Sequence, residues 1–363
     1  MSFEFSVLSF ELAKRGNSTP STQNSTLNTQ HSTLKTSVIV PTHDGVDMLR
    51  ECLEALRAQT YRDFETIVVD DASTDGTQAL LRGYPGLRVV RLPGKRGHGF
   101  VAAANAGIAA ARGDVVALLN NDAAPDPGWL GELVSALERN PWASMAASKL
   151  LLYDRPDTFH SAGDYYGLDG VPNSRGVWQR DTGQYDREEE VFGICAAAAA
   201  IRRSALVDLA KAGGTRPPHR LFDPQLWMYC EDVDLNLRAR LRGHRTVYVP
   251  TARVRHRLSA TGGGPLASYY VGRNTIYAIA KDLPAPLILR NLPRIASAQA
   301  KFALEALRHI RQPAARARLR GIIWGLLTWP RLLRTRRHVL ASARLGPKAL
   351  ENDLRRFSQT SPS

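Results

Sequence analysis

The sequence predicts an α/β fold in which a mostly parallel central sheet has helices on both faces. One observation is that short apolar runs alternate with helical patterns between residues 37 and 119, an order typical of parallel strands joined by helices. The other is that two of these runs end on polar side chains, at Asp70-Asp71 and at Asn120-Asn121-Asp122. The carboxyl ends of parallel strands share one edge of a sheet, and ligands bind there.

The first elements are predicted by short, regular patterns. Ser37-Val38-Ile39-Val40-Pro41 is a β-branched run ended by proline and predicts a buried strand. Apolar residues at three- and four-residue spacing between Met48 and Leu56 predict a helix. The same reasoning predicts strands over residues 66–71, 87–92 and 115–119 and helices over residues 76–81 and 101–112.

The second half of this region is less regular. Residues 153–191 are rich in Gly, Asp, Tyr and Arg without clear periodicity, and a long irregular segment inside a domain is usually functional or disordered. From Val233 the pattern is helical. Glu231, Asp232 and Asp234 could therefore be first-turn acids that favour the helix dipole. The aromatic residues before them would also bury these acids partly and shift their pKa values.

The polar strand ends have two interpretations. The stretch Asn120-Asn121-Asp122 could form a surface turn, because Asn and Asp favour turns. An acid at the end of a strand is also often a helix cap. After the second strand, however, Ser73-Thr74-Asp75 can supply the capping groups. We therefore expect Asp70-Asp71 to be free to bind a ligand.

The positive charge of the chain is concentrated in its last quarter. The 363 residues carry a formal net charge of +14, and the 17 Lys and Arg against 4 Asp and Glu after residue 280 leave +13 there. The preceding part is close to neutral, which argues against a nucleic-acid-binding surface. The three cysteines are far apart in the sequence, which argues against a disulfide framework or a zinc site.

Three regions are expected along the chain. Residues 1–36 are expected to form a disordered leader, because their Ser-, Thr-, Asn- and Gln-rich part has little apolar surface. Residues 37–280 form the predicted main domain, and residues 281–363 a basic helical region. Neither a signal peptide nor a run of about 18 apolar residues is recognisable, which favours a cytoplasmic protein.

Residues 281–363 alternate apolar clusters with arginines. Basic amphipathic helices with tryptophan suit the surface of an anionic membrane. The alternative is a helical appendage with solvated arginines. Prolines are expected to divide the region into short helices, at positions 284, 286, 293, 313 and 330.

Four stretches carry a family resemblance. They read SVIVPTH at 37–43, VVDDASTDGT at 68–77, LLNND at 118–122 and YCEDVDL at 229–235. In this order they resemble the motif series of family 2 inverting glycosyltransferases of the GT-A fold, a three-layer αβα sandwich. The resemblance extends over residues 37–284. Within the family, the chain is similar to the bacterial rhamnosyltransferase branch, on residues 181–186, 255–261 and 273–274.

The resemblance implies a binding site for a nucleotide-sugar donor. Asp70 matches the acid that holds the base and ribose in this family, and a carboxylate accepts strong hydrogen bonds from ring N–H groups and hydroxyls. For Arg273, a solvated helix start is the alternative. The other implied donor-binding residues are Pro41, Thr42, Asp71, Ser73, Asn105, Asn120 and Asn121.

The resemblance also implies a metal ion and a catalytic base. Asp122 matches the acid that binds Mg²⁺ or Mn²⁺ beneath the diphosphate, although Asn120 replaces the first acid of the usual acid-x-acid pattern. His256 is implied as a second metal ligand or as a structural histidine. Asp232 matches the general base and Glu231 a positioning group. We expect Asp70, Asp122 and Asp232 to converge around one cleft.

The implied activity is transfer of a sugar, such as rhamnose, in cell-surface polysaccharide synthesis. The expected donor is a UDP-, dTDP- or GDP-sugar, and the expected acceptor is a glycan or lipid-linked glycan at the inner face of the membrane. A non-catalytic membrane-bound scaffold with a degenerate transferase domain is one alternative. A nucleotide-dependent oxidoreductase is disfavoured, because a complete glycine fingerprint is absent from the sequence.

Overall fold

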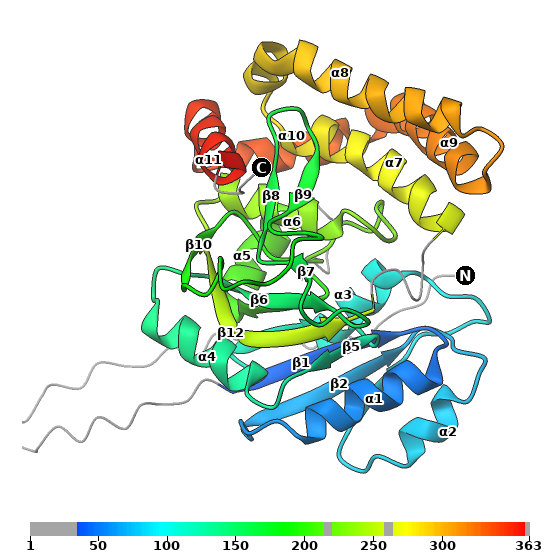
Figure 1. The fold of residues 1–363 in the computed structure, drawn as a ribbon, viewed down its shortest axis with the longest axis vertical. Helices are drawn as coiled ribbons and strands as arrows, with labels where there is room; N and C mark the ends of the chain where they lie inside the picture. The colour runs from blue at the N-terminus through cyan, green and yellow to red at the C-terminus, as the bar shows by residue number, and fades with distance from the viewer. Residues whose placement is uncertain (1–34, 214–219, 258–263, 360–363) are drawn as a thin grey trace, which may run out of the picture. The chain divides into compact units, whose positions relative to one another are not determined.

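The computed structural model describes residues 35–213, 220–257 and 264–359. These residues are organised around one ten-stranded sheet (Figure 1). The predicted leader over residues 1–36 lies outside the described residues except for its last two, and Thr36 already begins the first strand.

Most strands of the sheet run in one direction, as predicted. Along the path β10-β12-β6-β11-β4-β1-β2-β3, β10 and β11 are antiparallel to their neighbours, and the other six strands are parallel to one another. The strands of this path are β1 (Thr36–Thr42), β2 (Phe64–Asp70), β3 (Arg88–Arg91), β4 (Val115–Leu119), β6 (Met145–Leu152), β10 (Glu189–Val191), β11 (Ala198–Arg202) and β12 (Thr246–His256).

Short strands extend this sheet and form a separate hairpin. β5 (Ala123–Pro125) pairs with β12, and β7 (Phe159–Ser161) pairs with β6. β8 (Asp164–Tyr166) and β9 (Pro172–Ser174) pair only with each other in the part of the chain that the structure describes. The segment 153–191, which lacks clear periodicity in the sequence, thus contains β7, β8, β9 and β10.

Helices cover both faces of the sheet, which gives the predicted three-layer αβα arrangement. α1 (Val46–Arg57), α2 (Thr77–Arg82) and α4 (Trp129–Arg139) pack on one face, and α3 (Phe100–Ala110), α5 (Arg203–Ala212) and α6 (Glu231–Leu241) pack on the other (Figure 1). The helical spacing predicted for α1 is confirmed, because its buried residues are Leu49, Cys52, Leu53 and Leu56.

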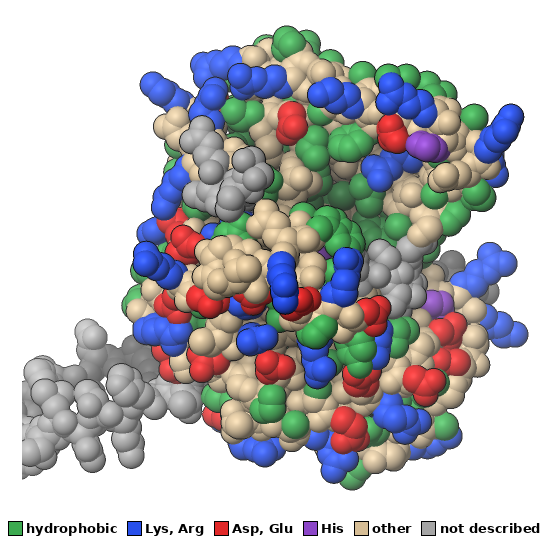
Figure 2. Space-filling model, in the orientation of Figure 1, with side chains coloured by type: hydrophobic (Ala, Val, Ile, Leu, Met, Phe, Trp, Pro, Cys, Tyr) green, Lys and Arg blue, Asp and Glu red, His purple; other side chains and the backbone are tan. Residues whose placement is uncertain are grey.

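The C-terminal region is helical, and it shares a hydrophobic core with α6. The predicted boundary between residues 280 and 281 lies inside α7, and the third core cluster joins α6, α7 and α8 to the last two helices. Lys and Arg side chains lie along these helices (Figure 2). No described helix combines the length and the apolar character that crossing a membrane requires. The elements are α7 (Gly264–Asp282), α8 (Ala285–Arg308), α9 (Pro313–Thr328), η1 (Trp329–Leu332), α10 (Leu333–Ala341) and α11 (Pro347–Gln359).

The prediction that Pro293 divides two helices is wrong. Pro293 lies inside the 24-residue helix α8. A proline there removes the hydrogen bond to the carbonyl of Leu289. Both residues are exposed, so water can replace that bond. By contrast, Pro286 and Pro313 lie in the first turns of α8 and α9, where no such bond is lost.

Buried ion pairs link α7 to α6. Nζ of Lys281 lies 2.8 Å from Oδ2 of Asp223 and also contacts Asp234. The guanidinium of Arg238 donates to Asp234 at 2.9 Å. Asp234 is therefore part of an ion-pair network as well as a first-turn acid of α6, and this network fixes the start of α6.

Candidate active site

A cavity of about 670 Å³ lies at the carboxyl edge of the sheet. It is lined by Thr42 at the end of β1, Asp71 after β2, the stretch Asn120-Asn121-Asp122 after β4, and His256 at the end of β12. The starts of α3 and α6 and parts of the 160–177 segment and α7 complete its walls. The polar strand ends therefore meet at one edge, as the sequence predicts.

The stretch after β4 is held in place by polar contacts. The side-chain amide of Asn121 donates to Oγ1 of Thr42 at 2.9 Å. The amide nitrogen of Asn120 lies 3.4 Å from Nε2 of His256. Oδ1 of Asp122 lies 3.1 Å from the same Nε2 atom, and Asp122 is 3% exposed. Asp122 and His256 thus face each other in a buried part of the cavity wall.

His160 packs against His256. The two imidazole rings stack at a centroid distance of 4.9 Å, and their Nδ1 atoms are 3.1 Å apart. Burial, with a smaller effect of His256, lowers the pKa of His160 to about 3. His160 is therefore neutral and can accept a hydrogen bond from Nδ1–H of His256. In that tautomer the Nε2 lone pair of His256 faces the carboxylate of Asp122.

This pair fits a divalent cation. Two electron-rich ligand atoms at 3.1 Å repel each other unless a proton or a cation lies between or beside them. Within the described residues, Oδ1 of Asp122 is buried and makes no hydrogen bond. A carboxylate oxygen suits Mg²⁺ and Mn²⁺, and an imidazole nitrogen completes a small ligand set. Asp122 and His256 are therefore the residues that could hold the metal.

Asp71 lines the cavity and also holds the two residues that precede α3. Its carboxylate accepts hydrogen bonds from the backbone N–H groups of His98 and Gly99, at 2.8 and 2.9 Å, and contacts Nδ1 of His98. The expectation that Ser73-Thr74-Asp75 capping leaves Asp71 free is wrong. Asp75 does accept from the first residues of α1 and α2, but Asp71 accepts from the two residues that precede α3.

Several implied donor-binding residues do not line the cavity. Asp70 is 1% exposed and accepts a hydrogen bond from the backbone of Ser73 at 2.9 Å, so both residues support the turn that carries Asp71. Asn105 exchanges hydrogen bonds with the backbone of Phe222. Of the three acids expected to converge, Asp122 and Asp232 line the cavity and Asp70 does not.

Arg273 also has a structural role. Its guanidinium donates to the carbonyls of Gln225 and Leu226, at 2.7 and 2.8 Å. The neighbouring Asn274 donates to the carbonyls of residues 226, 228 and 229. These bonds hold a loop in which Trp227, Tyr229 and Cys230 all have positive φ angles, a conformation that costs free energy for residues with a side chain. The loop delivers Glu231 and Asp232 to the cavity.

The two acids at the start of α6 have different surroundings. The carboxylate of Asp232 accepts hydrogen bonds from the backbone N–H groups of Val233, at 2.8 Å, and Ala196, at 3.3 Å. Among the described residues, Oε2 of Glu231 has no hydrogen-bond partner. Burial and the charge of Asp232 raise the pKa of Glu231 to about 8. Burial also raises the pKa of Asp232, and its two backbone donors oppose this effect. Glu231 is therefore protonated at neutral pH.

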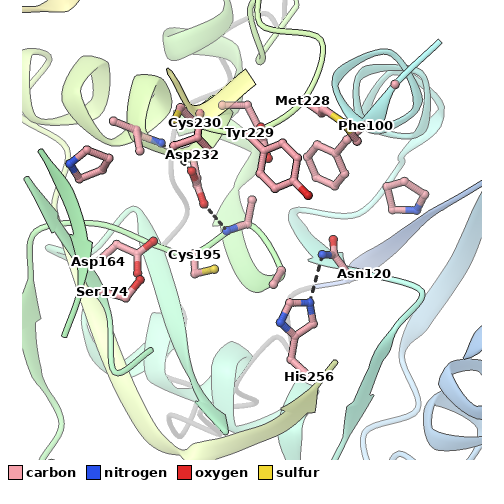
Figure 3. A pocket seen from close by; sticks show the side chains of 18 of the residues that line it. Phe100, Asn120, Asp164, Ser174, Cys195, Met228, Tyr229, Cys230, Asp232 and His256 are labelled. Atoms are coloured by element: carbon pink, nitrogen blue, oxygen red, sulfur yellow. Dashed lines mark hydrogen bonds between the residues drawn. The ribbon is translucent and has the colours of Figure 1, made fainter. Parts of the chain in front are cut away.

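Asp164 is a third acid at the same end of the cavity. Ligand atoms of Asp164, Cys195 and Asp232 lie within 4.8 Å of one another, and Figure 3 shows Asp164 and Asp232 across the cavity from Asn120 and His256, with Cys195 between them. Oγ of Ser161 donates to Asp164 at 2.7 Å. Burial and Asp232 raise the pKa of Asp164 to about 7. The sequence does not distinguish Asp164 from the other acids of the irregular segment.

Comparison with known proteins identifies the family of the domain that carries this cavity. The model of the family described as "Glycosyl transferase family 2" matches residues 37–209. The chain carries a glycosyltransferase domain of family 2. The matched range contains β1 to β11 and α1 to α4. It therefore includes the ends of β1, β2 and β4 that line the cavity, but not the end of β12.

The names of two relatives describe what those proteins do. The O-antigen biosynthesis protein RfbC of Myxococcus xanthus is 31% identical over 269 residues, 70% of this chain and 20% of that protein. An N-acetylglucosaminyl-diphospho-decaprenol L-rhamnosyltransferase of Mycobacterium tuberculosis is 29% identical over 271 residues, 68% of this chain and 83% of that protein. The chain spans a quarter or less of the length of the first two curated relatives it matches.

A solved structure supports the same fold. The crystal structure of GalNAc-T7 with UDP, GalNAc and Mn²⁺ matches 69% of this chain and 51% of its own chain, with a TM-score of 0.51 and 17% sequence identity. The chain therefore has the GT-A fold predicted from its motifs, with an added C-terminal helical region.

Proposed function

We propose that this glycosyltransferase moves one sugar from a nucleotide-sugar donor to a hydroxyl of a glycan, with inversion at the sugar carbon. The observation that carries the proposal is that the Asp122–His256 pair and the buried acids at the start of α6 line one cavity. A transfer of this kind needs a group to stabilise the leaving diphosphate and a base for the attacking hydroxyl.

The nucleotide would bind on the side of β1, β2 and β4. Pro41, Thr42 and Asp71 line this side, with Asn121 beside them. Asp71 has two carboxylate oxygens and already accepts bonds from the start of α3, so its remaining lone pairs can accept from a base or a ribose hydroxyl. Asp70, Ser73, Asn105 and Arg273 would act by holding the walls in place.

Asp122 and His256 would hold Mg²⁺ or Mn²⁺ next to the diphosphate. The cation supplies Lewis-acid stabilisation of the charge that grows on the leaving group. The family 2 pattern has an acid at position 120, and the amide of Asn120 contributes less charge to this site. We therefore expect the metal to bind weakly until the donor adds its own oxygens.

Asp232 would take the proton from the acceptor hydroxyl. Two backbone N–H groups donate to its carboxylate and favour the ionised form, whereas Oε2 of Glu231 has no hydrogen-bond partner among the described residues and burial keeps Glu231 protonated. Glu231 can then donate a hydrogen bond to a substrate oxygen. Because Asp232 and His256 lie at different ends of the cavity (Figure 3), the hydroxyl would attack opposite the leaving group, and the product would be inverted.

The acceptor would be a glycan carried on a lipid, at the inner face of the cell membrane. The support comes from the Mycobacterium tuberculosis relative, whose name describes a diphospho-decaprenol acceptor and an L-rhamnosyl group. Rhamnose is for the same reason the first sugar to test. A role in cell-surface polysaccharide synthesis agrees with the name of the O-antigen biosynthesis relative.

A donor screen tests this function. The melting temperature of the full chain is measured with UDP-, dTDP- and GDP-sugars, each with and without Mn²⁺. A true donor at about 100 times its Kd adds about 2.7 kcal/mol to the free energy of unfolding, and Mn²⁺ enlarges this shift. The same donor should then be hydrolysed slowly with Mn²⁺. Binding without any release of nucleotide would favour a non-catalytic scaffold, and no shift with any donor would contradict the proposal.

A further inference from the structure

The outer sides of α8 and α9 expose large apolar side chains. Leu289 of α8 is 70% exposed and Leu327 of α9 is 69% exposed. Scattered apolar residues are normal on a surface, but grouped ones mark an interaction site. We name the following eight residues the C-terminal apolar surface: Leu289, Leu292, Leu304, Leu307, Ile323, Trp324, Leu326 and Leu327.

The orientation of α8 is set by its buried side. Leu287 and Ile295 are buried in the core cluster shared with α6 and α7. The four exposed leucines of α8 fall within one arc on the other side of the helix, because steps of three and four residues return to the same face. This arc is flanked by Arg294 and Lys301, which are also exposed. α8 therefore has two apolar sides. One packs in the core, and the other is an exposed stripe bordered by basic residues.

The orientation of α9 is set by close contact with α7. A Cβ atom on Gly321 would lie 2.1 Å from the backbone oxygen of Tyr269, and one on Gly325 would lie 3.0 Å from Cβ of Ile276. Only a side without side chains can approach α7 so closely. The opposite side of α9 carries Ile323 and Leu327 and cannot turn inward without losing this contact.

Several basic side chains of the C-terminal helices have no acidic partner among the described residues, although Arg290 and Arg308 of α8 do. In the described part of the chain, none of the residues in the list that follows makes an ion pair with an Asp or Glu, and all are exposed. Charge of this kind attracts anionic lipid headgroups at about 1 kcal/mol for each basic residue near the surface. The residues are Arg294, Lys301, Arg311, Arg320, Arg331, Arg334 and Arg337.

We propose that the C-terminal apolar surface binds a bilayer that contains anionic phospholipid. The leucines and Ile323 enter the boundary between headgroups and acyl chains, and Trp324 lies at headgroup depth, where tryptophan is favoured. Arg294, Lys301 and Arg320 contact the headgroup phosphates. A stable attachment needs both signals, apolar contact and basic charge, and α8 and α9 supply both.

Binding would also orient the active site. α7, which holds α9, lines the cavity with Leu266 and Val271, and Figure 2 shows a hollow lined largely by hydrophobic side chains below the C-terminal helices. A membrane on the outer side of α8 and α9 would therefore lie at a fixed position relative to the cavity. This consequence rests on the proposed function, because the position of the membrane matters only if the acceptor is linked to a lipid. The binding to the bilayer does not depend on the proposed function.

Vesicle sedimentation tests the proposal. The full chain is mixed at low salt with vesicles of phosphatidylcholine alone or with phosphatidylglycerol added. We expect binding to the mixed vesicles only. The variant Leu289→Ser/Leu307→Ser/Ile323→Ser/Leu327→Ser should bind at least about tenfold more weakly, because it removes four apolar anchors. The matched control is Val89→Ser/Val207→Ser, which alters two similarly exposed apolar residues on β3 and α5 and should bind like wild type.

A second variant, which removes basic charge, distinguishes the contribution of charge from that of apolar contact. Arg294→Gln/Lys301→Gln/Arg320→Gln should weaken binding about 100-fold and flatten its salt dependence. Wild-type binding by the apolar variant, or equal binding to neutral vesicles, would overturn the proposal. So would a dimer in light scattering that the apolar variant abolishes, since a second copy would then cover the surface. Sedimentation does not measure sugar transfer, so a failed transfer assay leaves this result unaffected.

Discussion

Nε2 of His256 lies 3.1 Å from Oδ1 of Asp122, although Asp122 follows β4 and His256 is the last residue of β12. The register of β5 explains their proximity. In the antiparallel pair of β5 and β12, His256 is the partner of Ala123, the residue after Asp122. The three-residue strand β5 therefore brings Asp122 and His256 together, because its register with β12 sets the position of His256.

Replacing Asp122 tests the metal side. Asp122→Asn keeps the shape of the side chain and removes its charge. Because a cation at the diphosphate contributes several kcal/mol to the transition state, transfer with saturating Mn²⁺ should fall by about 100- to 1000-fold. The matched control is Asp126→Asn, an acid of the same segment that does not line the cavity. Equal losses in both variants would mean that charge at this edge, and not a metal ligand, matters.

Asp164 should change the basicity of its neighbour Asp232. Its carboxyl group lies within 4.8 Å of that of Asp232, and a nearby negative charge disfavours ionisation of a second carboxyl. Because burial and Asp232 raise the pKa of Asp164 to about 7, Asp164 is neutral in acid and gains its charge only near neutral pH. Its ionisation should make Asp232 a stronger base, so the wild-type pH–rate profile should change near pH 7, and Asp164→Asn should remove this change. Asp157→Asn, in the same segment, should keep it. A purely structural Asp164 would change the rate at all pH values equally.

Glu231 should make the fold less stable as the pH rises. Burial raises its pKa from 4.5 to about 8, so the folded state binds the proton more tightly than the unfolded state does. This contribution to the free energy of unfolding, on the order of a few kcal/mol, is fully present below pH 4.5 and is lost as the pH rises to about 8. In Glu231→Gln, denaturant unfolding at pH 5 and pH 8 should show a smaller decline. An identical decline in both proteins would contradict the burial of an uncharged Glu231.

Gly321 should be intolerant of any side chain. The Cβ atom of Gly321→Ala would meet the backbone of Tyr269 at 2.1 Å, so α9 must move away from α7. We expect a loss of about 1–3 kcal/mol, as is typical of overpacking, measured by thermal unfolding. Gly346→Ala is the control, because nothing lies within 4 Å of its Cβ position. Similar melting temperatures for both variants would contradict the close contact of the two helices.

The regular part of the fold is predictable from sequence patterns. β1, β2, β4 and α1 have strong apolar periodicity, and they lie where the sequence predicts them. The alanine-rich strand β11 is not predicted. Alanine favours helices, but Ala198–Arg202 is buried between β4 and β6 and completes their hydrogen bonds. Tertiary pairing therefore overrides local propensity at the centre of the sheet.

The candidate site is predictable only in part. The motifs indicate Asp122, Asp232 and His256, which do line the cavity. They do not separate Asp70 from Asp71, because which of two adjacent acids faces the cavity depends on the turn between them. They also do not reveal Asp164, because its position depends on the β8–β9 hairpin and not on any local pattern.

The most direct test of the account is donor binding and turnover in Asp232→Asn. The substitution removes the proposed base and leaves the metal side intact, so the melting-temperature shift caused by donor and Mn²⁺ should match that of wild type. Turnover should fall by about 100- to 10,000-fold, the usual contribution of a general base. Turnover near the wild-type value would show that another group accepts the proton and would contradict the assignment of Asp232.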